Sequence, residues 1–193
     1  DRSIGSTISN EMRSNAVKAL IVACIFMLFY IWFRFKDIRF AGSAIIALVH
    51  DVLVMLTGYA LIRISVGNTF IACILTIVGY SINDTIVIFD RIRENMQGMK
   101  KQTPETLAEV ANRSLTQTLS RSLNTSITTI IMVLLLFILG VSSIREFALP
   151  LMIGLISGTY SSIFIAAALW YVMKLHLGKD KLLKPAVAKT KKK

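Results

Sequence analysis

Four ionisable side chains lie within, or at the head of, apolar segments that are long enough to cross a membrane. They are His50, Asp51, Asp84 and Arg121. A charged side chain at the centre of a bilayer costs about 2.5–3.5 kcal/mol on the insertion scale, so such residues are usually paired, solvated or functional. These four positions are therefore the first candidates for chemistry in this chain.

Asp84 and Arg121 are the pair with the clearest potential. Asp84 lies about 9 Å inside its apolar run at 1.5 Å per residue, and Arg121 enters a later run from the same side at similar depth. Apolar surroundings and a nearby guanidinium act on a carboxyl pKa in opposite directions, so this pair can take up and release a proton near neutral pH. The alternative is a static ion pair that joins two helices.

Several uncharged polar residues fall at helical spacing from this pair or beside it. We expect them to hydrogen-bond water along a path through the membrane. These supporting residues are Tyr80, Asn83, Thr125 and Thr128.

Asp51 lies nearer the middle of its apolar run. We expect its side chain to point into the bundle as a hydrogen-bond acceptor, with a role in a proton relay as the alternative. His50 is about 100° away round a helix, so the two side chains do not share one face and a His–Asp catalytic couple is not expected. We interpret His50 as a packed or hydrogen-bonded imidazole.

Other chemistries lack their residues. The sequence has no HExxH motif and no glycine-rich phosphate loop, and Ser157 in "GLISG" is misplaced for a nucleophile elbow. Cys24 and Cys73 have no metal-site spacing. We therefore expect no enzyme activity, no metal site and no cofactor other than a proton gradient. Gly154 and Gly158 instead form a GxxxG pattern, which lets helices approach closely.

Five apolar runs supply the elements that position these residues. Hydrophobic residues make up 54% of the 193-residue chain, and its mean hydropathy is +0.65. The runs approach or exceed the ~20 residues that span a bilayer, and none has a charged face. The sequence predicts an all-α, polytopic membrane helix bundle over residues 16–173. The expected spans are about 16–33, 41–64, 68–89, 121–139 and 147–173.

Lys and Arg are distributed unevenly between the two sides of this bundle. Most of the 22 fall on one side, which the positive-inside rule places in the cytoplasm. We expect residues 1–15, which lead into the first helix, to lie outside and the basic tail over 174–193 to be cytoplasmic. Topology and attraction to anionic lipids then explain the net charge of +11. No nucleic-acid partner is expected; docking of the tail on an acidic partner or ribosomal RNA is the alternative.

The long inside connection over residues 90–120 contains a helix-start signal, "QTPET". Thr103 can cap a helix, Pro104 suits its first position, and Glu105 complements the helix dipole. Apolar residues follow at helical spacing. We expect a cytoplasmic amphipathic helix on the membrane face, leading into the fourth span.

The segment "GYSINDTIVIFDRIREN" (residues 79–95) closely resembles the signature of the SecF family, accessory membrane subunits of bacterial protein export. Three more segments resemble family motifs in the same order: "AIIALVHDV" (44–52), "SLTQTLSRSLNTSITT" (114–129) and "IGLISGTYSSIFIAAAL" (153–169). The likeness covers the chain up to about Met173.

The resemblance implies membership of the resistance–nodulation–division superfamily, whose transmembrane halves have six helices. A first helix and a periplasmic domain precede this region in the family, so we expect the C-terminal part, with five of six spans. The resemblance also implies a bacterial inner-membrane location and four partners: SecD, the SecYEG channel, the SecA ATPase and a translocating preprotein. It implicates the Asp of "IND" and the Arg of "LTQTL-x-R" in proton coupling; these are Asp84 and Arg121.

We therefore predict a proton-motive-force-driven subunit that assists late translocation of secreted proteins. Asp84 is the expected proton carrier, and Arg121 is expected to set its pKa and position. Proton binding would loosen the pair and let two helices shift. The alternatives are a small-molecule or drug exporter of the same superfamily and a passive scaffold with Asp84–Arg121 as a fixed clamp.

Overall fold

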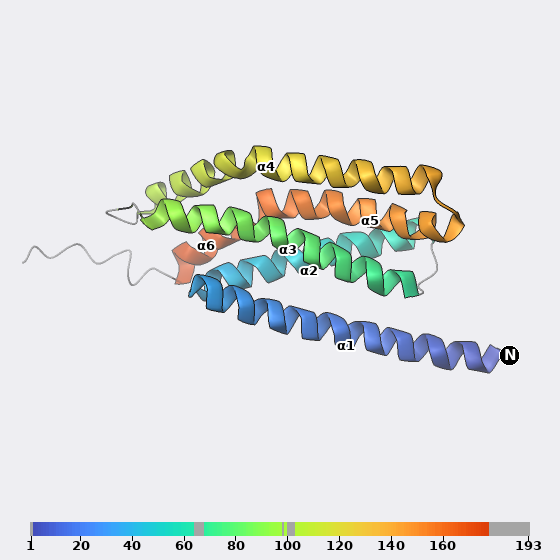
Figure 1. The fold of residues 1–193 in the computed structure, drawn as a ribbon. Helices are drawn as coiled ribbons and strands as arrows, with labels where there is room; N and C mark the ends of the chain where they lie inside the picture. Colours follow the sequence, from blue (N-terminus) through green and yellow to red (C-terminus); the bar gives the residue numbers. More distant parts are fainter. Residues whose placement is uncertain (1, 64–67, 98, 100–102, 178–193) are drawn as a thin grey trace, which may run out of the picture.

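The computed structural model describes residues 2–63, 68–97, 99 and 103–177, and these fold into helices without a strand (Figure 1). The expected all-α architecture is confirmed. The helical segments are α1 (Arg2–Phe35), α2 (Ile38–Ile62), α3 (Asn68–Gln97), α4 (Pro104–Leu139), α5 (Ser142–Tyr160), the π-helix η1 (Ser161–Ala166) and α6 (Ala167–Leu177). The basic tail predicted over 174–193 lies outside the described residues beyond Leu177.

Five helical stretches in the described part of the chain are long and apolar enough to cross a bilayer, as the sequence predicted. The last of them is composite. α5, η1 and α6 join end to end, so that Ser142–Leu177 forms one stretch of 36 residues. A π-turn therefore lies in the middle of the last span.

α4 is longer than the span expected over 121–139. It runs unbroken for 36 residues, so the helix expected on the membrane face and the fourth span form one element. Thr103 caps it as predicted, since its Oγ1 accepts a hydrogen bond from the backbone N–H of Thr106, and Pro104 begins the helix. The first turns bury Leu107 and Ala111 against neighbouring helices. This face of the helix therefore packs on the bundle.

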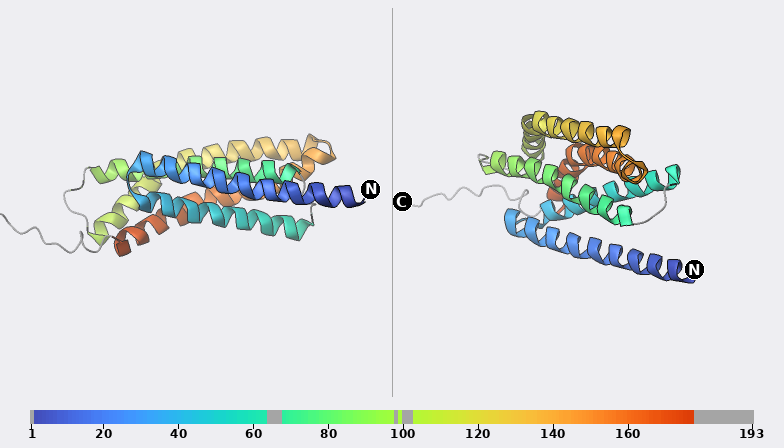
Figure 2. Two further views of the ribbon diagram at one scale, coloured as in Figure 1. Left: turned by 90° about the horizontal axis from the view of Figure 1, so that it is seen from below. Right: turned by 45° about the vertical axis from the view of Figure 1, so that its right-hand side comes forward.

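The centre of the bundle consists of α2, α3 and the α5–α6 stretch, with α4 on one side and α1 on the other (Figures 1 and 2). α1 diverges from the bundle towards its N-terminus. Only 6% of its window Val17–Phe35 is buried, and Phe26 is 70% exposed. Such a surface suits lipid or another transmembrane helix, because neither penalises exposed apolar side chains.

A cluster of aromatic rings packs between the four helices that meet at one end of the bundle. The ring centroid of Phe40 lies 5.0 Å from that of Phe35, 4.9 Å from that of Phe89 and 5.2 Å from that of Trp170. Aromatic pairs at these separations add about 0.5–1.5 kcal/mol each beyond their area burial. The cluster joins α1, α2, α3 and α6.

Ion pairs surround the same end, which we call the basic end. Arg34 of α1 pairs with Asp90 of α3 at 2.9 Å, and Lys174 of α6 pairs with Asp37 at 3.3 Å. Asp37 also caps α2 through the backbone N–H of Arg39. These partly exposed pairs add little stability, but they fix how the helix ends are arranged.

The GxxxG pattern brings α5 close to α3. A Cβ atom added at Gly154 would overlap the side chain of Ile77, and one added at Gly158 would lie 3.1 Å from the Cβ of Ser81. Larger residues at these positions would force the two helices apart. The close approach places polar side chains of α3 and α5 within hydrogen-bonding distance.

Candidate functional site

Asp51 lies at the centre of the bundle, is fully buried, and accepts hydrogen bonds from three other helical segments. Ser81 of α3 and Ser161 of η1 each donate to its Oδ2 at 2.6 Å. Ser157 of α5 donates to Oδ1 at 2.8 Å. We call these four residues the Asp51 cluster. The cluster ties together the helices that form the middle of the molecule.

His50 extends the cluster to its edge. Its Nδ1 lies 3.2 Å from Oδ1 of Asp51, and the side chain is 36% exposed. From the angle of about 100° between neighbouring residues of a helix, we expected the two side chains to lie on different faces. In the structure the imidazole turns towards the adjacent carboxylate, so the two groups are in contact. The ring also lies near Tyr160, with centroids 6.4 Å apart. His50 is therefore a hydrogen-bonded imidazole rather than an isolated one.

The hydrogen-bond partners of Asp51 match the acceptor sites of a carboxylate. Such a group only accepts hydrogen bonds, through about four lone-pair sites. Both oxygens of Asp51 have two polar partners each, which offsets much of the desolvation that a buried charge suffers. The geometry fits the expected hydrogen-bond acceptor within the bundle.

The sequence analysis did not single out the serines of the Asp51 cluster. Ser157 and Ser161 are four residues apart and so lie on one face of the last span, which was the signal available in the sequence. A second layer lies beside them. The hydroxyls of Thr85 and Ser162 are 2.9 Å apart, and Ser162 donates to the backbone carbonyl of Ser81 at 3.2 Å. Small polar residues therefore line the whole contact between α3 and η1.

Asp84 has different surroundings. It is half-buried between α3 and α4, where Ser122 donates to its Oδ1 at 2.5 Å. Its Oδ2 is buried and has no hydrogen-bond partner among the described residues. A buried oxygen without a partner is costly. A donor from outside this chain would satisfy it, and protonation would remove the buried charge. Asp84 therefore has an unused acceptor where Asp51 has none.

Arg121 does not form the direct ion pair with Asp84 that the spacing suggested. It immediately precedes Ser122 on α4, but its side chain is exposed and makes no ion pair or hydrogen bond within the described residues. Its charge acts on Asp84 only over a longer distance. The reason is helical phase: Ser122 takes the inward position, about 100° round the helix from Arg121. A fixed Asp84–Arg121 clamp is thus absent from this arrangement.

The supporting polar residues divide between inward and outward faces. Thr125 and Thr128 are exposed, and each donates to a backbone carbonyl four residues earlier at 2.9 Å. Asn83 is also exposed. Tyr80 alone of the four joins an interhelical chain, since its hydroxyl donates to Oγ of Ser126 at 3.1 Å. Tyr80 therefore lies on the Asp84 side of the bundle, and Asn83, Thr125 and Thr128 lie on the surface.

The hydrogen bond from Tyr80 to Ser126 belongs to a series of hydrogen bonds that joins three helices. Ser126 of α4 lies 2.7 Å from the hydroxyl of Thr159 of α5. This series of hydrogen bonds lies one helical turn from Asp84 on α3 and from Ser122 on α4.

No group of three His, Cys, Asp or Glu side chains that could hold a metal ion occurs in the described ranges.

Comparison with known proteins identifies the family. The profile described as "Protein export membrane protein SecD/SecF, C-terminal" matches residues 1–176. The chain belongs to this family. The resemblance seen in its motifs is confirmed, and the span-capable helices make it an integral membrane protein.

Named relatives agree with this assignment. The chain is 48% identical over 168 residues to "Protein translocase subunit SecF" of Alicyclobacillus acidocaldarius, which covers 87% of this chain and 54% of that one. It is 44% identical over 171 residues to "Protein translocase subunit SecDF" of Bacillus subtilis, covering 89% and 23%. The chain spans about half the length of the SecF relatives that it matches.

A solved structure supports the fold. The chain superimposes on the "Crystal structure of SecDF in Super-membrane-facing form" with a TM-score of 0.79 and 44% sequence identity, covering 89% of this chain and 23% of that one. Two of these relatives carry the combined name SecDF, in which the region like this chain is a minor part of a longer polypeptide.

Proposed function

We propose that this chain is the transmembrane part of a SecF-type subunit that couples proton passage to late-stage translocation of secreted proteins. The observation that carries the proposal is Asp84, a carboxylate between two spans with one buried oxygen that has no partner in the described part of the chain. Family membership and relatives named as protein translocase subunits support the role in export.

Asp84 is the proton carrier in this proposal. In its charged form it accepts a strong hydrogen bond from Ser122 of α4. A proton on Oδ2 fills the unused position, removes the charge and weakens the bond to Ser122. α3 and α4 can then shift relative to each other. One proton charge that crosses 100 mV supplies about 2.3 kcal/mol, which is comparable with the worth of one charged hydrogen bond.

Arg121 acts at a distance on Asp84 and faces outward. We propose that its guanidinium meets a carboxylate of the SecD partner, since a charge on the surface of a span needs a partner or water. Thr125 and Thr128 lie on the same exposed side of α4 and supply further polar contacts there. This replaces the internal Asp84–Arg121 pair by a contact between two subunits.

The remaining partners and the orientation also belong to the proposal. The subunit works with SecD beside SecYEG, SecA and a translocating preprotein in the bacterial inner membrane. Its basic end lies in the cytoplasm, near anionic lipids, because basic residues gather there. An enzymatic activity, a nucleic-acid partner and a bound cofactor are not expected.

The test replaces Asp84 by Asn in the full-length subunit, assembled with SecD. Asn has the size of Asp but cannot carry the proton. We expect proton-driven export into membrane vesicles to fall to the level seen without a proton gradient. Export that keeps its full dependence on the gradient would remove Asp84 from the mechanism.

Asp90→Asn is the matched control, because Asp90 has the same side chain on the same helix but pairs with Arg34 at the basic end. We expect this variant to retain proton-driven export. The small-molecule exporter remains distinguishable: it would show substrate-dependent proton flux in vesicles that lack the export channel.

A further inference from the structure

The π-turn η1 changes the direction in which the last span presents its buried face. Successive residues of an α-helix turn by about 100°. If the last span were one continuous α-helix, the buried residues from Pro150 to Ser162 would share one mean direction round the helix axis. The mean direction of Ala166, Ala167 and Trp170 would differ from it by about 150°. The extra residue of a π-turn takes up about 100° of that difference. Without the turn, α6 would point its buried face away from the bundle.

The hydrogen bonds around η1 come chiefly from the Asp51 cluster. Ser157 precedes the turn and Ser161 begins it, and both donate to the Asp51 carboxylate. Ser162 is held by Thr85 and by the backbone carbonyl of Ser81. Within the turn, Ile163 and Ala166 contribute only apolar packing. Among the described residues, Asp51 is the ionisable group to which this stretch of helix donates hydrogen bonds, through Ser157 and Ser161.

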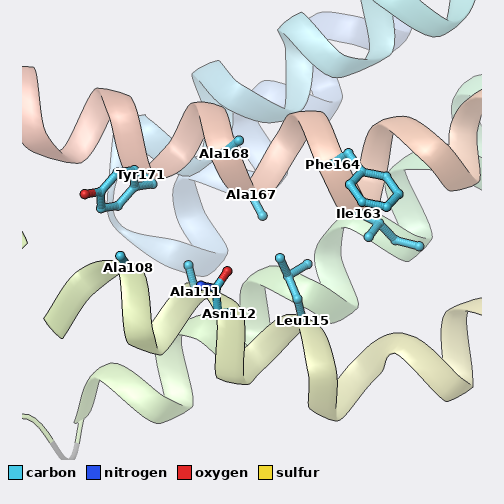
Figure 3. Close-up of a pocket in the computed structure, with 9 residues that line it drawn as sticks. All are labelled: Ala108, Ala111, Asn112, Leu115, Ile163, Phe164, Ala167, Ala168 and Tyr171. Carbon is cyan, nitrogen blue, oxygen red and sulfur yellow. The ribbon is translucent and has the colours of Figure 1, made fainter. Parts of the chain in front are cut away.

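Beyond the turn, the aromatic cluster and the Lys174–Asp37 ion pair hold α6, but its packing is incomplete. A cavity of about 330 Å³ lies between α4 and the η1–α6 stretch, with Ala111 and Leu115 on one side and Ile163 and Ala167 on the other (Figure 3). Trp170 is fully buried against Phe40, yet its indole N–H has no hydrogen-bond partner in the described part of the chain. α6 thus has space beside it and an unsatisfied donor in its present position.

We propose that Asp51 is a positioning residue that holds the last span in its π register and so sets the rotation of α6. The carboxylate accepts hydrogen bonds from Ser157 and Ser161, on either side of the start of the turn. These bonds stabilise the π-helical conformation of η1, which contains one residue more than an α-helical turn. When this acceptor is lost, η1 relaxes to an α-helix and α6 rotates by about 100°. The rotation carries Trp170 out of the aromatic cluster and separates Lys174 from Asp37. This proposal does not depend on proton coupling.

The experiment follows Trp170 in the full-length protein, with Trp32 and every tryptophan outside residues 1–193 replaced by Phe, in lipid nanodiscs that contain brominated phospholipid. Bromine atoms quench tryptophans that face lipid. In the parent protein we expect Trp170 to be protected. In Asp51→Asn we expect this protection to be lost, because the amide cannot accept hydrogen bonds on both sides as the carboxylate does.

A one-residue deletion provides the decisive step. A π-turn contains one residue more than an α-helical turn. Deleting the exposed Phe164 from the turn in the Asp51→Asn protein removes one residue, so an ordinary α-helix can then replace the π-turn. The resulting α-helix presents Trp170 to the bundle again, so protection from quenching should return. Deleting the exposed Val172, which follows Trp170, is the control and should restore nothing.

Two outcomes would overturn the proposal. One is a folded Asp51→Asn protein in which Trp170 stays protected; the other is a failure of the Phe164 deletion to restore protection. If Asp51→Asn does not fold, Ser161→Ala replaces it, because that variant removes one of the two bonds across the turn and keeps the charge. Protection that is unchanged in folded Ser161→Ala would overturn the proposal in the same way.

Discussion

At the scale of single residues, two carboxylates embedded in the same bundle have opposite surroundings. Each oxygen of Asp51 has two polar partners, whereas Asp84 has one donor and, among the described residues, one oxygen without a partner. The arrangement around Asp51 suits a structural role, and that around Asp84 leaves one oxygen available to another group. Pairs of titratable groups whose environments differ in this way are where acid–base roles separate.

This contrast predicts different costs for the same substitution. Asp51→Asn should lower the free energy of unfolding by about 1–3 kcal/mol, because buried serine hydroxyls lose a charged acceptor. Asp84→Asn should lower it by less than about 1 kcal/mol, since the amide oxygen of Asn can still accept the hydrogen bond from Ser122 and only the contribution of the charge is lost. Unfolding of the two variants and the parent in detergent micelles measures the difference. Equal losses in both variants would mean that the two carboxylates are held alike.

The sequence singled out the charged residues that lie inside the spans, but not what they touch. Asp51, Asp84 and Arg121 stood out because charges are rare in apolar spans. Their partners did not, because Ser122 and the serines of the Asp51 cluster are common in helices and usually bond to their own backbone. The one-residue difference between Arg121 and Ser122 decided which side chain faces Asp84, and spacing alone could not resolve it.

At the scale of helices, the close contact between α3 and α5 positions the Asp51 cluster. It depends on Gly154 and Gly158, which leave space for Ile77 and Ser81. The spans themselves were predictable, because bilayer thickness fixes the length of an apolar run. The π-turn was not predictable: the last span is apolar on most faces, so a change in its phase leaves no mark in the residue pattern.

Gly154→Ala tests the close contact. The added Cβ overlaps the side chain of Ile77, so we expect a loss of about 1–3 kcal/mol in the free energy of unfolding. Ile77→Ala in the same chain should recover part of it by making room. Gly79→Ala on α3 is the control, because a Cβ there meets nothing within 4 Å; it should be neutral or stabilise by about 0.5–1 kcal/mol. A Gly154→Ala protein as stable as the control would contradict the packing described.

At the scale of the whole molecule, the bundle has two surfaces that suit neighbours. α1 leans away from the other helices (Figure 2), and it exposes apolar side chains between Val17 and Phe33. α4 carries Arg121 and exposed threonines on its outer side. The chain also spans only about half the length of its SecF relatives. The sequence could predict the number of spans found in the described residues, but not which surfaces face outward, because helix packing decides that.

The central claim is that Asp84, and not Asp51, takes up and releases a proton. Infrared difference spectroscopy of the full-length protein with SecD, recorded between two pH values, detects a protonated carboxyl through its C=O stretch. The account predicts a carboxyl band that changes with pH, disappears in Asp84→Asn and persists in Asp51→Asn. A band that persists in Asp84→Asn and disappears in Asp51→Asn would contradict it.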